Sequence, residues 1–261
     1  MNTHSARVEG IGFWARGLPD WNAARAHVAS GALVVDAPAK PAPALLAPNE
    51  RRRAPESVAV ALAVALAACT HAGRDPRLLA SVFASTHGDL AITDYMCATL
   101  AADPKAISPT RFHNSVHNAA AGYWTIGTGC VQPATAVSAS SATFAQGLVE
   151  ALAQLATGTG TGAVLLAAYD TGSTGPLGSM SPSEGLLGGA LVLSAATGGT
   201  RLRATLVDGS PSPADGPLAR HAAGNAMAPM LPLFDALAGG ADLVLLDAGP
   251  GRALRVELAH D

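Results

Sequence analysis

The feature that most constrains the fold is a regular alternation between short apolar segments with strand-like patterning and longer segments with helical spacing. We expect helices at residues 21–30, 54–72, 89–102, 118–128, 143–156 and 226–238. We expect strands at residues 7–14, 78–85, 134–138, 163–169, 189–194, 201–208, 242–247 and 253–258, with 134–138 alternating as a buried strand does. This order predicts an α/β protein whose sheet faces are covered by helices.

The remaining segments are expected to connect these elements. Residues 37–49 are rich in proline and alanine, residues 103–117 show no regular pattern, and Gly73 is placed to end the helix before it. The glycine run at 158–162 follows a helix and precedes a strand, whereas a phosphate-binding loop follows a strand and opens a helix. We therefore expect a connector there, and no nucleotide or other cofactor.

The composition excludes two classes of protein. The 261 residues are 49% hydrophobic and 13% charged, with a formal net charge of −3. This hydrophobicity argues against a disordered chain, and the lack of a basic surplus argues against nucleic-acid binding. A surface with so few charges indicates that part of it is covered by a partner.

Other features bear on the cellular compartment. The longest apolar run, 58–69, is too short to span a bilayer, and residues 1–14 lack the pattern of a signal peptide. Cys69, Cys97 and Cys130 lie in unrelated contexts with no C-x-x-C spacing, so neither a disulfide framework nor a zinc site is indicated. We expect a cytoplasmic protein that does not insert into membranes.

One histidine pair has a spacing that could serve a metal. His113 and His117 are four residues apart and would share one face of a helix. No third ligand is evident, so we favour a hydrogen-bonded pair in a loop and expect no bound metal.

Several motifs occur in a fixed order along the chain. Three arginines at 51–53 precede the long helix, N-A-A-A-G stands at 118–122, and S-P-S-E-G-L-L-G-G-A-L-V-L at 181–193. In this order the chain resembles the N-terminal half of the β-ketoacyl synthases of the thiolase superfamily, from Arg7 to about Asp208. The resemblance implies a thiolase-like layered α/β/α fold, with residues 1–208 as the N-terminal-like half. Residues 209–261 would be a condensed C-terminal remnant packed on the same domain.

The sequence departs from this family at the nucleophile. A ketosynthase carries its acyl chain on a cysteine where a strand meets a helix N-terminus, which lowers the thiol pKa and supplies oxyanion donors. Counting from Gly122 places Ser141 at that position, and counting from Gly147 places Ala139 there. Neither is a cysteine, and a serine at such a turn also serves as a helix cap.

A second departure concerns the two histidines that the family's second half supplies. The segment at 220–224, R-H-A-A-G, is similar to one helix start of that half, so His221 is a possible relic of one histidine. A solvent-facing histidine at a helix start is an equal alternative. We expect this chain to be too short for a complete second half, and therefore expect no assembled catalytic centre.

A ketosynthase-like chain without the cysteine resembles the chain length factors of type II polyketide systems, and most of all the short subunits of aryl polyene pathways. This resemblance implies a heterodimer with a cysteine-bearing β-ketoacyl-ACP synthase, whose acyl tunnel the chain would shape, and contact with acyl carrier protein through the complex. A crossing loop would reach into the partner, and the strand at 134–140 would lie in the interface. The implied interface and tunnel residues are Arg111, Phe112, His113, Asn114, Ser115, Val116, His117, Val137, Ser138, Ala139, Ser140 and Phe144.

Bulky side chains would set the length of the tunnel. Phe112, Tyr123 and Phe144 are the candidates, although isolated aromatic residues also serve as ordinary core.

Two other functions stay open. The chain could be a serine-dependent acyltransferase in which Ser141 is paired with His221, or a homodimeric scaffold or binding protein.

Overall fold

The computed structural model describes residues 3–158, 161–196 and 199–260. Its centre is one eight-stranded sheet in the order β3-β2-β4-β5-β1-β6-β8-β7. Strand β2 runs parallel to both β3 and β4, and every other neighbouring pair is antiparallel. The strands are β1 (Thr3–Ala15), β2 (Ala80–Ala84), β3 (Ala134–Val137), β4 (Ala163–Asp170), β5 (Leu187–Ser194), β6 (Thr200–Asp208), β7 (Leu243–Asp247) and β8 (Arg252–Ala259).

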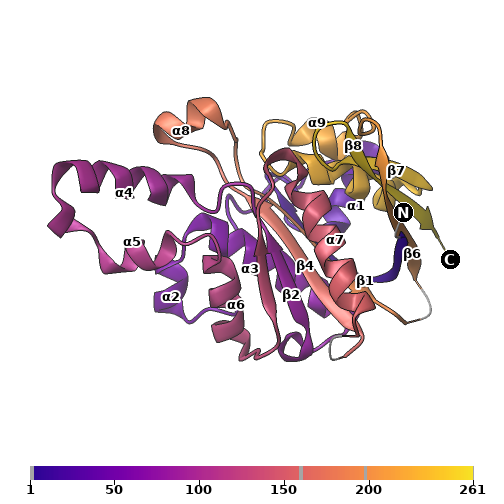
Figure 1. Cartoon of the computed structure of the whole chain (residues 1–261), viewed down its shortest axis with the longest axis horizontal. Helices are drawn as coiled ribbons and strands as arrows, with labels where there is room; N and C mark the ends of the chain where they lie inside the picture. The colour runs from indigo at the N-terminus through magenta and orange to yellow at the C-terminus, as the bar shows by residue number, and fades with distance from the viewer. Residues whose placement is uncertain (1–2, 159–160, 197–198, 261) are drawn as a thin grey trace.

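Helices cover both faces of this sheet, as the alternating sequence predicts (Figure 1). One face packs against α1 (Trp21–Ser30), α7 (Thr143–Ala156), α9 (Pro217–His221) and α10 (Leu231–Gly239). The other face packs against α3 (Glu56–Ala72) and α6 (Ala119–Thr128). Every residue of β4 and β5 is buried, which explains why both strands read as continuous apolar runs.

Helix α3 lies unusually close to β1 because two strand residues have no side chain. A Cβ atom on Gly10 would lie 2.1 Å from the Ala68 carbonyl oxygen, and one on Gly12 would lie 2.0 Å from the Val64 carbonyl oxygen. Glycine at these two positions therefore lets the backbones of helix and strand touch.

The expected helix at 54–72 is α3, which begins at Glu56, and a separate helix that was not expected precedes it. A short helix, α2 (Pro48–Arg53), comes first, and α3 begins only after Pro55, whose ring fixes φ and removes a backbone donor. At the other end Gly73 adopts φ +62 and its N–H bonds to the Cys69 and Thr70 carbonyls, which confirms that it ends the helix.

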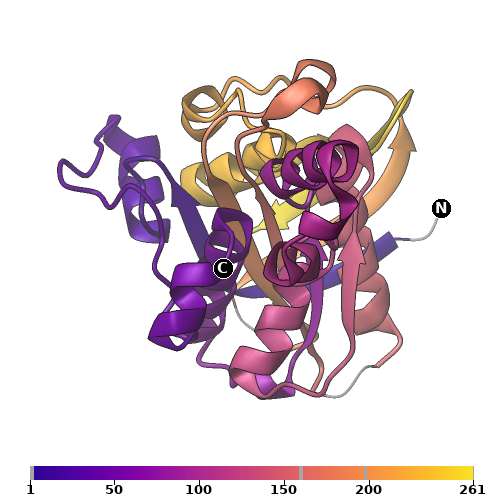
Figure 2. The ribbon, with the colours of Figure 1, turned by 90° about the vertical axis from the view of Figure 1, so that its left-hand side faces the viewer.

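Three helices project from one end of the sheet as an arm, seen at the left of Figure 1 and facing the viewer in Figure 2. They are α4 (Leu90–Ala102), α5 (Pro109–Asn114) and α8 (Gly175–Met180). The expectation that 103–117 is irregular is wrong in part: Asp103 and Ser108 cap η2 (Pro104–Ala106) and α5, each with proline at its first position. Of the α4 residues only Leu90 is buried.

The C-terminal part of the chain also differs in detail. In place of a single helix at 226–238, the structure has η4 (Ala228–Met230) followed by α10, with proline in the first turn of each. Residues 209–260 add β8 and β7 beside β6, so they extend the same sheet. The glycine run at 158–162 follows α7 and precedes β4, although residues 159–160 lie outside the described residues.

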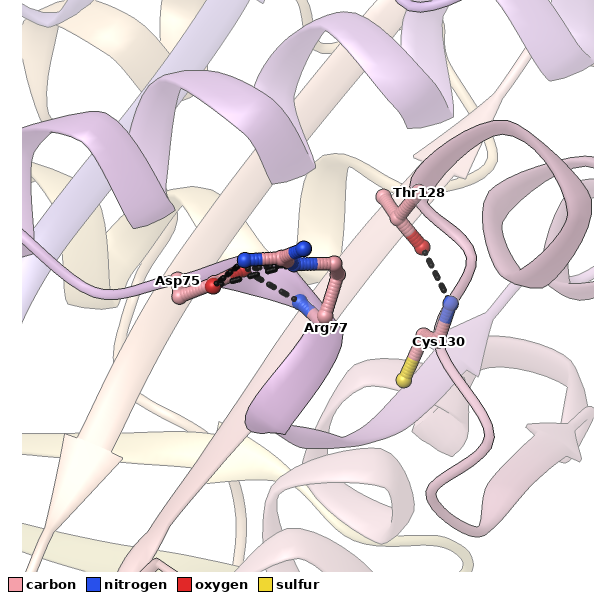
Figure 3. Close-up of polar contacts among 4 residues, drawn as sticks. All are labelled: Asp75, Arg77, Thr128 and Cys130. Atoms are coloured by element: carbon pink, nitrogen blue, oxygen red, sulfur yellow. Dashed lines mark hydrogen bonds and ion pairs between the residues drawn. The ribbon is translucent and has the colours of Figure 1, made fainter.

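At the opposite end from the arm, polar contacts order the chain where β2 begins (Figure 3). Asp75 caps η1 (Pro76–Leu78) through the Arg77 N–H and pairs with the Arg77 guanidinium at 2.6 Å. The backbone N–H of Cys130 donates to the Thr128 hydroxyl at 3.1 Å (Figure 3). These contacts fix the segments that lead into β2 and β3.

Among the described residues no helix is long and apolar enough to cross a membrane.

Candidate functional site

The candidate site is the turn that joins β3 to α7. Its residues pass through η3 (Ser140–Ala142), and Ser140 has φ +53, the only positive φ at a non-glycine among the described residues. A left-handed conformation at serine costs energy and persists only where its surroundings impose it. The turn is therefore a strained strand-to-helix junction of the type that displays a nucleophile.

The hydroxyl of Thr143 holds this turn closed. It accepts a hydrogen bond from the Ala139 N–H at 2.9 Å and donates to the Ser140 carbonyl at 2.6 Å. An oxyanion site needs backbone N–H groups free to face a reacting carbonyl. At Ala139 that donor is already bonded within the protein.

The side chains of the turn face outward. Ser138, Ser140 and Ser141 are exposed, whereas Phe144 is buried in the core with its ring 6.2 Å from that of Phe234. Ser138 donates to the Thr86 carbonyl at 3.0 Å, which fastens the turn to the loop after β2.

The proposed partner of Ser141 lies elsewhere. His221 ends α9, where its Nε2 is 2.7 Å from the Arg16 carbonyl oxygen and its ring centroid is 5.1 Å from that of His27. Within the described part of the chain, no hydrogen bond joins His221 to Ser141. The Ser141–His221 pair suggested by the sequence is therefore not assembled.

The three cysteines also lie outside the turn. Cys69 is buried in α3, and burial raises the pKa of its thiol to about 12, which keeps it protonated and unreactive. Cys130 is buried with its thiol directed at the Leu79 carbonyl, and Cys97 is exposed on α4. None of them is placed to accept an acyl chain at the junction.

The segment expected to cross into a partner forms α5 and its exit. Arg111 lies over the Tyr95 ring at 4.0 Å, and Asn114 is buried and accepts from the Tyr123 hydroxyl at 3.0 Å. Phe112 and Val116 are exposed by 60% and 48%, and Ser115 donates to the Phe112 carbonyl.

The two histidines of this segment point to different neighbours. His113 packs against the Tyr123 ring at 6.1 Å, whereas His117 Nε2 is 2.7 Å from the Ser85 carbonyl oxygen. They belong to the end of α5 and the loop after it, and do not share one helical face. Across the described residues, no group of three potential metal ligands is found.

A buried carboxylate organises the loop after β2. Asp170 is fully buried and accepts hydrogen bonds from the Ser85 hydroxyl at 2.7 Å and from the backbone N–H groups of Thr86 at 2.9 Å and His87 at 3.2 Å. Burial raises the pKa of Asp170, while these bonds and the nearby His87 oppose that rise.

The loop after β2 also carries His87, which contacts a serine that the sequence analysis did not connect with it. His87 Nε2 lies 2.6 Å from the hydroxyl oxygen of Ser181, which follows α8. The two residues are 94 positions apart, and no spacing or motif in the sequence joins them. The only signal was indirect, since Ser181 opens the S-P-S-E-G segment, which is one of the motifs that carry the family resemblance.

A cavity of about 700 Å³ lies between the arm and the sheet. Its lining includes charged and other polar residues: Arg53, Glu56, Asp89, Ser108, Thr110, Arg111, Asn114, Thr171, Ser173 and Thr174. Both basic and acidic groups are present, so the lining does not favour one sign of charge.

The sequence identifies the class to which this chain belongs. The family model of the β-ketoacyl synthase N-terminal domain matches residues 21–230, and the chain is a member of that family. No curated protein matches the sequence significantly.

Solved structures of similar fold define the relationship further. A ketosynthase in complex with its chain length factor from Xenorhabdus doucetiae aligns over 98% of this chain and 97% of that one, with 21% identity and a TM-score of 0.73. The ishigamide ketosynthase/chain length factor aligns over 98% and 99%, with 16% identity and a TM-score of 0.72. A type II polyketide acyl carrier protein in complex with its ketosynthase bound to the hexaketide aligns over 100% of both chains, with 13% identity and a TM-score of 0.74. These likenesses show a ketosynthase-type, thiolase-like α/β fold.

Proposed function

We propose that this chain is a chain-length-factor-like subunit that does not perform the condensation itself. It would pair in the cytoplasm with a cysteine-bearing β-ketoacyl-ACP synthase and shape that partner's acyl tunnel, in polyketide, aryl polyene or fatty-acid-like synthesis. The observation that carries the proposal is the junction of β3 and α7, where an unpaired sheet edge leads into a strained turn without a cysteine.

The outer edge of β3 is available for pairing. Ser81 N–H donates to the Pro133 carbonyl and Ser85 N–H to the Val137 carbonyl, so alternate residues of this strand face β2. The backbone groups of Ala134 and Ala136 therefore point away from the sheet. The expected buried strand is in fact an exposed edge strand, with Ala134 and Ala136 exposed. A partner strand that pairs with this edge would bury it.

Apolar side chains are exposed to solvent in α5, in α6 and in the loop that leads into β3. Val131 is 91% exposed, Ile126 is 73% exposed and Phe112 is 60% exposed. Exposed apolar groups beside an unpaired strand are typical of a permanent interface. A small number of charges on the chain as a whole agrees with this interpretation.

The similar structures favour a ketosynthase as the partner. Two of them are ketosynthase and chain length factor pairs, and a third holds an acyl carrier protein with its ketosynthase. By the same likeness, carrier protein would reach this subunit through the complex. Phe112 is the best-placed candidate for contact with the partner, whereas Phe144 lies within this chain's own core.

Co-expression with a cysteine-bearing ketosynthase encoded beside this chain tests the proposal. We expect a 1:1 complex in size-exclusion chromatography with light scattering, and we expect Ala136→Arg to abolish it by placing a charge on the edge strand. Ala29→Arg, on the exposed surface of α1, is the matched control and should leave the complex intact.

Two results would contradict the proposal. One is a stable homodimer of this chain that does not exchange with the ketosynthase, which would favour a scaffold. The other is a heterodimer whose affinity is the same with Ala136→Arg as with Ala29→Arg, since β3 would then lie outside the interface.

A further inference from the structure

Beside the vacant nucleophile position, the structure holds a serine and a histidine in contact. The Ser181 hydroxyl oxygen is 2.6 Å from His87 Nε2, within the range in which a base takes a proton from a nucleophile. Ser181 is exposed, so its hydroxyl can be reached from solvent, and His87 is half-buried beneath it.

Ser181 is held by a loop that closes on itself. Ser173 and Ser183 exchange two bonds at the loop ends: Ser173 N–H to the Ser183 carbonyl at 2.8 Å, and Ser183 N–H to the Ser173 hydroxyl at 2.9 Å. The Ser183 hydroxyl also accepts from the Ala226 N–H at 3.0 Å. The loop containing α8 is therefore anchored at its base, which fixes where Ser181 meets His87.

His87 is held from the other side by buried groups. Asp170 accepts from its backbone N–H, and the Ser85 hydroxyl, itself a donor to Asp170, accepts from the Gly88 N–H at 2.8 Å. The imidazole Nδ1 is buried and has no hydrogen-bond partner among the described residues. The ring is therefore positioned through its backbone and leaves Nε2 for Ser181 alone.

The buried carboxylate also suits the charge that a base acquires. When His87 Nε2 takes a proton, the ring becomes a cation close to Asp170, whose pKa burial raises and a positive charge on His87 lowers.

From this geometry we propose that Ser181 and His87 form a nucleophilic dyad that accepts an acyl group from a thioester. The Ser181 oxygen attacks the carbonyl carbon while its proton passes to His87 Nε2. The carbon–sulfur bond then breaks, and the leaving thiolate takes the proton back from the imidazolium. The products are an acyl ester of Ser181 and a free thiol, with no oxidant or reductant involved.

The dyad lies next to the turn where the family places its cysteine. His87 follows Thr86, whose carbonyl accepts from Ser138 and whose hydroxyl lies 3.4 Å from the Ser140 carbonyl oxygen. His87 is therefore one residue away from the contacts that join its loop to the junction. This activity goes beyond the proposed tunnel-shaping role, and it belongs to the chain without its partner.

The test is acylation of the purified full chain with octanoyl-N-acetylcysteamine thioester, followed by intact-mass and tandem mass spectrometry. We expect one octanoyl group on the peptide that contains Ser181, and none in Ser181→Ala. His87→Gln keeps a hydrogen-bonding side chain but cannot act as the base, so the acylation rate should fall by at least about 100-fold.

Matched controls separate chemistry from folding. Ser179→Ala, at an exposed serine of the same loop, should acylate like the unaltered chain, and circular dichroism should show that all variants are folded. Absence of an adduct on the unaltered chain would overturn the proposal. An adduct that survives Ser181→Ala and is lost in Ser141→Ala would also overturn it, as would an unchanged rate in His87→Gln.

Discussion

The close contact between β1 and α3 leads to a quantitative prediction for Gly12→Ala. The new Cβ would lie 2.0 Å from the Val64 carbonyl oxygen and 2.8 Å from its carbon, so helix and strand must separate. Because the obstacle is backbone, no side chain can rotate to relieve the overlap. Overpacking of this kind costs about 1–3 kcal/mol, and the rigid obstacle favours the upper end. Alanine also leaves the unfolded chain fewer backbone conformations than glycine does, which offsets about 0.4–1 kcal/mol of this cost.

We therefore expect Gly12→Ala to lower the free energy of unfolding by about 2 kcal/mol and Tm by roughly 4–8 °C, at the scaling typical of chains of this size. Thermal unfolding followed by circular dichroism, together with urea titration, measures both quantities. Gly122→Ala is the matched control, since a Cβ there has no atom within 4 Å and lies in a helix. It should raise stability by about 0.5–1 kcal/mol. If Gly12→Ala leaves Tm unchanged, or both substitutions lower it equally, the close-contact argument is refuted.

Further predictions concern the junction and the buried carboxylate. Ser140→Gly should stabilise the protein by about 1 kcal/mol in urea unfolding, because glycine adopts φ +53 without strain; a loss of stability would contradict this. Thr143→Val should destabilise it by about 1–3 kcal/mol in the same assay, because the Ala139 N–H loses its acceptor. The pKa of Asp170 is raised by burial, so the folded state holds its proton to higher pH than the unfolded state. Stability should accordingly fall as pH rises from the ordinary aspartate value to the raised one, and Asp170→Asn should remove this part of the pH dependence in unfolding titrations. An unchanged profile would refute that assignment.

Much of the fold could be predicted because its signals are local. Helical spacing and strand patterning are set within ten or so residues, and α1, α6 and α7 begin and end within a residue or so of their expected limits. The boundary between α2 and α3 was also predictable. Pro55 has no backbone N–H to bond to a preceding helical turn, so a helix that comes before it ends there. Similarly, the proline residues at 104 and 109 follow capping residues that could have indicated η2 and α5.

The site was harder to predict because its contacts are distant in sequence. Alternation in β3 could not reveal whether the strand lies inside the sheet or at its edge, since both give the same pattern. The pairing of His87 with Ser181 depends on how the loop after β4 folds back across the end of β2. Sequence reasoning offered the pair of Ser141 and His221 only as an alternative, and within the described residues His221 instead contacts the Arg16 carbonyl and the His27 ring.

The long strand β1 has a consequence for how the chain acquires its structure. Its first half pairs with β6, from Thr3 against Thr205 to Val8 against Thr200, and its second half pairs with β5. During synthesis this strand leaves the ribosome before either of the strands that pair with it, and it meets the earlier of them, β5, only after Leu187 has been made. Until then both of its edges must remain unpaired, with apolar side chains on its two faces, Phe13 on one and Trp14 on the other. Chains released before β5 should therefore aggregate, and expression of this protein should depend on chaperones that bind nascent chains.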